Sequence, residues 1–298
     1  MPADPAALLD SGFCVSYKTM GGDWNPIGCA KLVLLLFLNV HASQNLVRCG
    51  VPPVRGTDCS QIKSQHPEAT SGLYMIQPAG VPKPFKVFCE MQSDGGWTVF
   101  QKRSGGEVSF RKDWLAYKHG FGNPQSDHWL GLQRLWAITK AGGSRWALRV
   151  DLWDFEGGSA FAEYRDFKLG NESQAYRLEV WGYYGTAGDA IRGRDPSALL
   201  LPGLNQNCRS FSTLDRDNYS CAPCAFGNIS ADTCSHEEGG GGWWYSRRCG
   251  LASLHGEWHP AGKNWDQASG LHWFTWKDSG PYSARATRMM VKAHVANQ

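Results

Sequence analysis

The stretch from Phe211 to Cys249 constrains the fold most strongly, because it combines closely spaced cysteines with glycines and tryptophans. Two carboxylates, Asp215 and Asp217, stand at alternate positions in a turn-rich sequence and can face one hard cation. Four glycines and an aromatic run follow at residues 239–245, which suits a close approach of the backbone beside a large amphipathic surface. The stretch predicts a stapled binding loop with a calcium site rather than a catalytic cleft.

Length and composition predict a folded, loop-rich protein. The chain has 298 residues, and 42% of them are apolar, so it can bury a core. Its 14 tryptophans and 35 glycines are typical of loops held by buried aromatic side chains. The formal net charge is only +3 and no long run of lysine and arginine occurs, so we expect no nucleic-acid partner.

An apolar run from Leu32 to Val40 predicts a signal peptide. It is far shorter than the roughly 20 residues that span a bilayer, but it has the size of a signal-peptide core. Small residues at its end predict cleavage after Ala42, which makes residues 1–42 a leader. A start at the second methionine gives a signal of ordinary length, 20–42, whereas the full leader is unusually long and acidic. An uncleaved signal anchor is the weaker alternative, and we expect a secreted, extracellular protein without a membrane span.

Secretion places the remaining cysteines in an oxidising compartment, where disulfides are the default. After removal of the leader, these cysteines are Cys49, Cys59, Cys89, Cys208, Cys221, Cys224, Cys234 and Cys249. A zinc site at Cys221-x-x-Cys224, with His236 nearby, is an alternative that suits a cytosolic protein better. Three N-x-S sequons agree with the secretory route and predict glycosylation at Asn171, Asn218 and Asn228.

Short apolar runs alternate with turn signals from Asp58 onward, which predicts strands of an antiparallel sheet. The expected strands are residues 72–76, 85–89, 95–101, 146–152, 160–164 and 176–180. Short helices are expected at 113–120 and 131–138, and periodicity is lost after Gly185. Residues 43–56 form a short polar segment without heptads or Gly-X-Y repeats, so any oligomer must be built in another way.

A series of ordered motifs resembles the fibrinogen C-terminal domain family over residues 57–296. The motifs are Asp58-Cys59-Ser60, Gly72-Leu73-Tyr74, Phe88-Cys89-Glu90-Met91, Asp94-Gly95-Gly96-Trp97-Thr98-Val99, Trp129-Leu130-Gly131-Leu132, Phe211-Ser212-Thr213-Leu214-Asp215-Arg216-Asp217 and Gly242-Trp243-Trp244-Tyr245. The resemblance implies an α+β fold with a central antiparallel sheet, short helices and a loop-rich C-terminal part that holds calcium. Secreted relatives include ficolins, angiopoietin-like proteins and microfibril-associated glycoproteins.

The same resemblance implies a disulfide map. One bond joins Cys59 to Cys89, and a second closes on Cys249, for which Cys234 fits the family spacing better than Cys221 or Cys224. Residues 219–233 resemble an insertion, which a further bond from Cys208 to Cys221 or Cys224 would staple. Cys49 then takes the remaining partner or links two chains, so we expect a disulfide-linked homo-oligomer through Cys49.

The calcium site matches the family pattern in part. The resemblance implies that Asp215 and Asp217 supply side-chain ligands and that the carbonyls of Tyr219 and Cys221 complete the shell. Tyr219 stands where many members carry another acidic residue, and fewer charges around the ion lower its affinity. The alternative is that the two aspartates only cap a turn.

The ligand pocket departs further from the family. Members that bind acetyl groups carry a histidine after the second cysteine of the pair, and Gly250 stands there in this protein. We expect a reshaped ligand surface of aromatic and histidine side chains. Its candidates are Trp243, Trp244, Tyr245 and His255, with Trp258 and His259 beside them. The alternative for each of these residues is packing in the core.

We compare three classes of function for this sequence: a recognition protein, a receptor ligand and a hydrolase. The main expectation is a secreted, calcium-binding recognition protein for glycans, acetylated groups or extracellular matrix, with a role in innate recognition or at the cell surface. The alternative is an angiopoietin-like ligand of a cell-surface protein receptor, which tolerates loss of the sugar pocket. A hydrolase is not expected, because Gly-x-Ser-x-Gly is absent and His236-Glu237 lacks the second histidine of a zinc-protease helix.

Overall fold

The computed structural model describes eight stretches of the protein: residues 55–140, 144–194, 203–218, 224–226, 229–231, 233–262, 269–277 and 282–294. All of them belong to one compact unit, residues 54–298. The predicted leader and nearly all of the 43–56 segment, including Cys49, lie outside the described residues.

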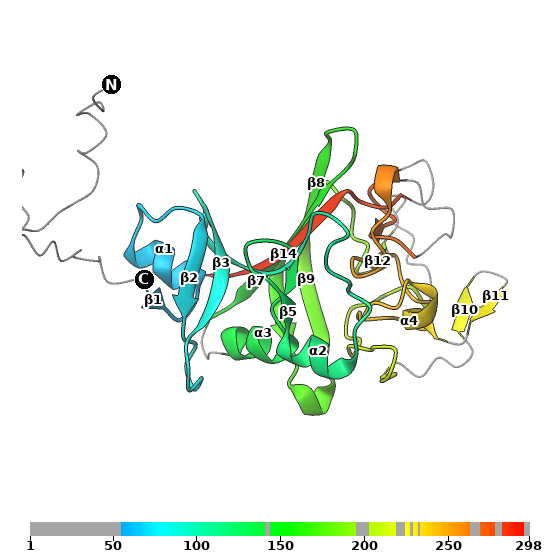
Figure 1. Ribbon diagram of the computed structural model, residues 1–298, viewed down its shortest axis with the longest axis horizontal. Helices are drawn as coiled ribbons and strands as arrows, with labels where there is room; N and C mark the ends of the chain where they lie inside the picture. The colour runs from blue at the N-terminus through cyan, green and yellow to red at the C-terminus, as the bar shows by residue number, and fades with distance from the viewer. Residues whose placement is uncertain are drawn as a thin grey trace, which may run out of the picture. The chain divides into compact units, whose positions relative to one another are not determined.

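A ten-stranded sheet organises this unit (Figure 1). Its strands run in the order β1-β2-β3-β4-β14-β7-β8-β9, while β5 and β6 pair with each other and β6 also pairs with β4. The strands are β1 (Arg55–Gly56), β2 (Gly72–Ile76), β3 (Phe85–Gln92), β4 (Gly95–Arg103), β5 (Phe121–Gly122), β6 (His128–Trp129), β7 (Trp146–Trp153), β8 (Ser159–Leu169), β9 (Leu178–Gly185) and β14 (Ala286–Ala293). All pairs are antiparallel except β1 with β2.

The predicted sheet and helices are confirmed, and the observed strands are mostly longer than expected. The sheet strands at 72–76 and 85–92 illustrate this, since the first matches its prediction and the second extends it by three residues. The predicted helices are α2 (Trp114–His119) and α3 (Leu132–Thr139), which pack against each other. Tyr117 of α2 and Leu135 of α3 are fully buried in the main core. The fold is therefore of the expected α+β class.

The C-terminal strand β14 is the main element that the sequence patterns did not predict. It lies between β4 and β7, so it closes the centre of the sheet. Met289, Met290 and Val291 in the middle of β14 are all at most 1% exposed, which means that both faces of the strand are covered. A strand buried on both faces lacks the polar–apolar alternation by which strands are recognised in sequence.

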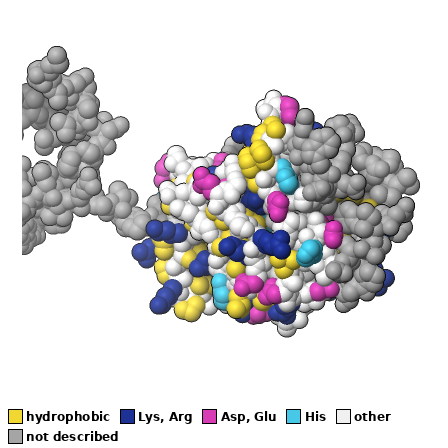
Figure 2. Space-filling model, turned by 45° about the vertical axis from the view of Figure 1, so that its right-hand side comes forward, with side chains coloured by type: hydrophobic (Ala, Val, Ile, Leu, Met, Phe, Trp, Pro, Cys, Tyr) yellow, Lys and Arg dark blue, Asp and Glu magenta, His cyan; other side chains and the backbone are white. Residues whose placement is uncertain are grey.

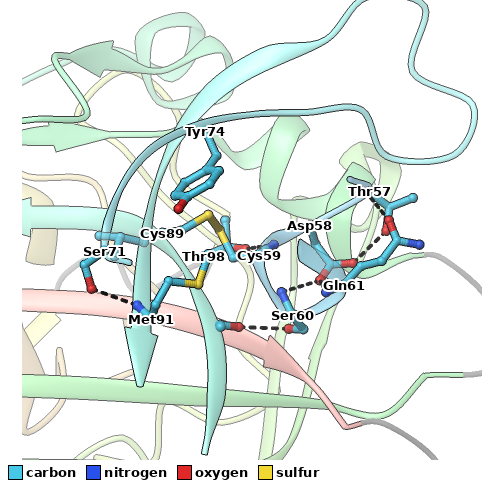
Figure 3. Close-up of a disulfide and its surroundings, with 12 residues drawn as sticks. Thr57, Asp58, Cys59, Ser60, Gln61, Ser71, Tyr74, Cys89, Met91 and Thr98 are labelled. Carbon is cyan, nitrogen blue, oxygen red and sulfur yellow. Dashed lines mark hydrogen bonds between the residues drawn. A yellow bond between two sulfur atoms is a disulfide. The ribbon is translucent and has the colours of Figure 1, made fainter. Parts of the chain in front are cut away.

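Helix α1 (Cys59–Gln65) was also not predicted, and it is pinned to the sheet by local bonds (Figure 3). Asp58 caps the helix, because its Oδ1 accepts from the amides of Ser60 at 2.8 Å and Gln61 at 3.1 Å. The Ser60 hydroxyl donates to the Gly96 carbonyl at 3.0 Å, and the Cys59–Cys89 disulfide joins the helix to β3. The aspartate cap and the disulfide therefore hold this short helix against β3 and β4.

Residues between β9 and β14 form a loop-rich half with little regular structure. Its elements are β10 (Cys224–Phe226), β11 (Ile229–Ala231), α4 (Cys234–Glu237), β12 (Ala252–Ser253), a 3-10 turn at Pro260–Gly262 and β13 (His272–Trp273). Another 3-10 turn, η2 (Glu172–Gln174), connects β8 to β9. Figure 2 shows basic and acidic side chains interspersed over the visible described surface. The fold therefore presents a long sheet joined to a half made of loops.

Candidate functional site

The aromatic run after the glycines is part of the core. Trp243, Trp244, Tyr245 and His255 are each at most 1% exposed. Their rings contact Phe211, with 4.9 Å between the Phe211 and Trp244 centroids, and Trp129, with 4.8 Å between the Trp129 and His255 centroids. The prediction that these four residues form a ligand surface is therefore wrong, because aromatic side chains from α2, β6 and residue 211 cover them. We call the four residues the aromatic cluster.

Three polar atoms of the aromatic cluster bind backbone groups, whereas His255 Nε2 is buried without a hydrogen-bond partner. Trp244 Nε1 donates to the Tyr176 carbonyl at 2.8 Å, and the Tyr245 hydroxyl donates to the Gly241 carbonyl at 2.7 Å. His255 Nδ1 lies 2.7 Å from the Gly242 carbonyl, and burial lowers the pKa of its imidazole to about 3. The ring is therefore neutral at physiological pH and serves packing rather than proton transfer.

The glycines before the aromatic cluster allow this burial. A Cβ on Gly241 would collide with the His255 carbonyl, and one on Gly242 would lie 2.7 Å from the Phe211 ring. The run therefore passes directly against the core, as the close backbone approach predicted from the sequence requires. What it approaches is the protein's own aromatic core.

Gln206 occupies the space beside Gly250, and the sequence patterns did not identify it. Its Nε2 donates to the carbonyls of Cys249 at 3.2 Å and Ala252 at 2.8 Å, and its Oε1 accepts from the Ala252 amide at 3.2 Å. Any Cβ at Gly250 would collide with the Gln206 side chain. Glycine instead of histidine at this position is thus matched by a buried glutamine that binds the neighbouring backbone.

Two disulfides are present among the described residues: Cys59–Cys89 and Cys234–Cys249. These are the pairs that the family resemblance implies. The expected bond from Cys208 to Cys221 or Cys224 is not formed, because Cys208 is an exposed free cysteine. Its amide donates to the Leu178 carbonyl at 2.7 Å, so the backbone at this position is held against β9. The side chain of Cys224 and all of Cys221 lie outside the described parts.

Residues 211–218, which we call the aspartate loop, lie beside α2. Asp215 Oδ1 accepts from the Thr213 hydroxyl at 2.7 Å and from the Trp114 amide, at the start of α2, at 2.9 Å. Arg216 lies over the Trp114 ring, with 3.9 Å from its Cζ to the ring centroid. Asp215 and Asp217 are both exposed, whereas Tyr219 and Cys221 lie outside the described residues. Asp215 thus fixes the loop to α2 with one oxygen and presents a second oxygen.

The three sequons differ in their surroundings. Asn171 is exposed and caps η2 through its Oδ1, which accepts from the Ser173 hydroxyl at 2.7 Å and from the Gln174 amide at 3.2 Å. Asn218 uses its side-chain nitrogen instead, donating to the Phe211 carbonyl at 2.7 Å. Asn228 lies outside the described residues. The glycan-accepting nitrogen is therefore engaged at Asn218, while the bonds of Asn171 fall on its oxygen.

The described residues contain neither a membrane-spanning helix nor a cluster of three metal-ligating side chains. None of the helices in these ranges has the length and apolar character that a membrane span requires. Within the same residues, no three side chains of histidine, cysteine, aspartate or glutamate gather as a metal site. A calcium site built from two aspartates and backbone carbonyls is of a different kind, because it has only two such side chains.

Comparison with known proteins gives consistent matches over the described unit. The family model for the C-terminal globular domain of fibrinogen beta and gamma chains matches residues 55–294. Angiopoietin-4 of Bos taurus and of Homo sapiens are each 42% identical over 237 residues, which cover 79% of this chain and 42% of the relative. The chain thus spans less than half of the length of these relatives.

Solved structures agree with the sequence matches. The fibrinogen-like globe domain of human ANGPTL2 superposes with a TM-score of 0.67 at 32% identity, covering 79% of this chain and 98% of that structure. Lamprey fibrin D-dimer, in complex with the peptide Gly-His-Arg-Pro-amide, superposes with a TM-score of 0.68 at 33% identity, covering 86% and 81%. The similarity extends through the sheet and the loop-rich half alike.

Proposed function

Because the protein belongs to the family of C-terminal globular domains found in fibrinogen beta and gamma chains, we propose that it is an angiopoietin-like ligand of a cell-surface protein receptor. The observation that carries the proposal is the 42% identity to angiopoietin-4 over nearly the whole domain. Burial of the aromatic cluster supports it, since a protein-binding surface does not require an aromatic sugar pocket. Binding of acetylated groups or matrix remains the second candidate and has less support.

Family membership also bears on two broader expectations. Angiopoietins and related fibrinogen-like proteins are secreted and non-enzymatic. The predictions of secretion and of no enzymatic activity are therefore confirmed. Innate recognition and a disulfide-linked oligomer through Cys49 stay predictions.

We place the receptor contact on the exposed face of the aspartate loop. Leu214 is 36% exposed there, beside two carboxylates and the stacked Arg216, so an apolar anchor sits within a charged rim. Leu73 of β2, at 37% exposure, is a matched residue in the sheet.

Competition tests this placement. The secreted protein should displace labelled human angiopoietin-4 from cells that bind it. Leu214→Asp should weaken displacement by at least about tenfold, because it puts a charge at a desolvated contact, whereas Leu73→Asp should leave it unchanged. Absence of any displacement by folded protein would reject the receptor proposal. Equal losses in the two variants would reject only the placement at the aspartate loop.

We also propose that the aspartate loop binds Ca²⁺. The residues fit, because Asp215 is fixed to α2 by one oxygen and keeps a second, and Asp217 stands two positions later on the exposed side of the loop. Asp215 and Asp217 would hold the ion with carboxylate oxygens, and the carbonyls of Tyr219 and Cys221 would complete its shell. The ion would neutralise two neighbouring carboxylates and order the loop.

Thermal unfolding with and without calcium tests this second proposal. Free calcium at 100 times its Kd should stabilise the protein by about 2.7 kcal/mol, and a chelator should remove this gain. Asp217→Asn should abolish the calcium response, whereas Glu257→Gln, an exposed carboxylate of the same half, should preserve it. A response that survives Asp217→Asn would contradict the proposed ligands.

A further inference from the structure

A groove of about 390 Å³ lies on the face of the sheet over β7, β8 and β14, and nothing in the proposed function uses it. Its lining includes Arg149, Asp151, Trp153, Phe161 and Arg288. The volume falls near the lower end of the range for ligand sites, which suits a single ring. None of the lining residues belongs to the aspartate loop or the aromatic cluster.

Arg149, Asp151 and Arg288 of the groove lining belong to a row of alternating charges that crosses the sheet. Asp151 is 5% exposed and binds an arginine through each oxygen: Arg149 Nε lies 2.8 Å from Oδ1, and Arg288 Nη2 lies 2.8 Å from Oδ2. The row ends at two further carboxylates, with Arg288 Nη1 2.7 Å from Glu90 and Arg149 Nη1 3.4 Å from Glu163. Three carboxylates and two guanidinium groups are thus locked together.

Strand register explains why the row of charges is rigid. Arg288 stands opposite Asp151 across β14 and β7, and Arg149 stands opposite Glu163 across β7 and β8. Four of the five charges therefore stand at ladder positions with a cross-strand partner of opposite sign, whereas Glu90 stands opposite Trp97 and reaches Arg288 with its side chain. The groups are fixed by the sheet before any ligand arrives, which lowers the entropy cost of binding.

Aromatic rings form the apolar part of the same groove. The Arg149 guanidinium lies 4.2 Å from the centroid of Phe161, and that of Arg288 lies 5.4 Å from the centroid of Trp153. Tyr184 of β9, 55% exposed, lies outside the lining and contacts Phe161 edge to face, with 5.4 Å between the ring centroids. The groove thus combines ring edges with fixed donors and acceptors at close range.

We propose that this groove binds a neutral hexose at the end of a glycan. A hydroxyl both donates and accepts, so neighbouring sugar hydroxyls can donate to Asp151 and accept from Arg149 or Arg288 without breaking an ion pair. The C–H face of the sugar ring can pack against Phe161 and Tyr184. An anionic ligand would instead compete with a carboxylate for its guanidinium partner and leave that carboxylate uncompensated.

Ligand-observed NMR on the secreted protein tests the proposal, using the methyl glycosides of mannose, galactose and glucose as probes. At least one should bind with a Kd of about 1 mM, the range expected for a single small ring. Glucuronic acid should bind at least about tenfold more weakly. A calcium chelator should leave the signal unchanged, which separates this groove from the aspartate loop.

Two variants place the binding in the groove. Ser159 is exposed and lines the groove, so Ser159→Trp fills it and should weaken binding at least about tenfold. Gln133→Trp, on the exposed side of α3, is the matched control and should bind as the unmodified protein does. Failure of all three neutral glycosides to bind, or undiminished binding by folded Ser159→Trp, would overturn the proposal. Receptor competition is a separate assay, so either proposal can fail alone.

Discussion

The sheet, with its helices α1–α3, and the loop-rich half provide hydrogen-bond partners for their buried backbone groups in different ways. In the sheet, backbone groups pair with each other along ladders such as β7–β8 and β4–β14. In the loop-rich half, the described ladders are only two or three residues long, and side chains such as Gln206 and Trp244 bind the backbone instead. Buried backbone groups must find partners in either case. A half without long ladders therefore depends on single side chains.

The largest expected effect comes from removing one such side chain. Trp244→Ala should destabilise the protein by about 3–5 kcal/mol, because it leaves a cavity in the core and deprives the Tyr176 carbonyl of its donor. Trp181→Ala in β9, where the side chain is 48% exposed, should cost less than about 1 kcal/mol. Urea unfolding measures both. Equal costs would mean that the loop-rich half does not depend on its buried aromatic residues.

Removal of a disulfide should cause the next largest loss of stability. The bonds close loops with sequence separations of 30 residues for Cys59–Cys89 and 15 residues for Cys234–Cys249. Changing both cysteines of either pair to serine should cost about 3 kcal/mol, with slightly more for the longer loop.

Hydrogen exchange measures which residues lose protection when each disulfide is removed. Loss of Cys234–Cys249 should raise exchange mainly in residues 233–262, which lack long ladders, while β7 and β8 stay protected. Loss of Cys59–Cys89 should loosen α1 and leave β3 paired. Uniform loss of protection in both double variants would show that the two halves unfold as one unit.

The buried carboxyl group of Glu238 should have a smaller effect on the stability of the protein. This residue is fully buried at the end of α4, its carboxylate lies 3.7 Å from His272 Nε2, and burial raises the pKa of the carboxyl well above its usual range. The folded protein therefore binds this proton more tightly than the unfolded protein does. The contribution of Glu238 to stability is fully present below its ordinary pKa of 4.5 and is lost as pH rises through the raised value.

Glu238→Gln should consequently stabilise the protein by about 1–3 kcal/mol at pH 8, and the gain should shrink toward pH 4.5. Glu237→Gln changes the exposed neighbour and should have no effect at either pH. Thermal unfolding across this pH range measures the difference. A gain that grows on acidification would contradict the sign of the pKa shift.

Changes at the sequon asparagines should have the smallest effect on stability. Asn171→Gln, in the turn between β8 and β9, should change stability by less than about 1 kcal/mol, and mass spectrometry should find a glycan there. A glycan at Asn218 would leave a single N–H on the nitrogen that donates to the Phe211 carbonyl and would crowd this bond, so we expect it to cost about 1 kcal/mol and occupancy to be lower than at Asn171. Full occupancy at Asn218 with unchanged stability would show that the loop adapts to the glycan.

The alternating strands could be predicted because their patterns are local. Residues 72–76 and 146–152 carry turn signals at their ends, and the structure places strands there. Strand β14 could not be predicted from the sequence, because its central residues are apolar on both faces. Its partners in β4 precede it by more than 180 residues, as the bond between Gln101 and Thr287 shows, and no local pattern encodes such a pairing.

The candidate site was harder to predict than the sheet. An aromatic run after glycines is compatible with an exposed pocket or with a core, since both need large rings and close backbone approach. Tyr117 and Trp129 decide between them by packing against His255, although they lie far away in the sequence. Gln206 gave no signal at all, because a lone glutamine predicts nothing until Gly250 is placed beside it.

The amino-acid sequence by itself determined the fold family, the alternating strands and the aspartate pair, because ordered motifs and periodicity are properties of neighbouring residues. Only the tertiary structure decided that Trp243 and Trp244 face inward, that β14 lies at the centre of the sheet and that Glu90, Arg288, Asp151, Arg149 and Glu163 form one row of charges. These features depend on which distant segments meet, and that is set by packing of the whole domain rather than by local preference.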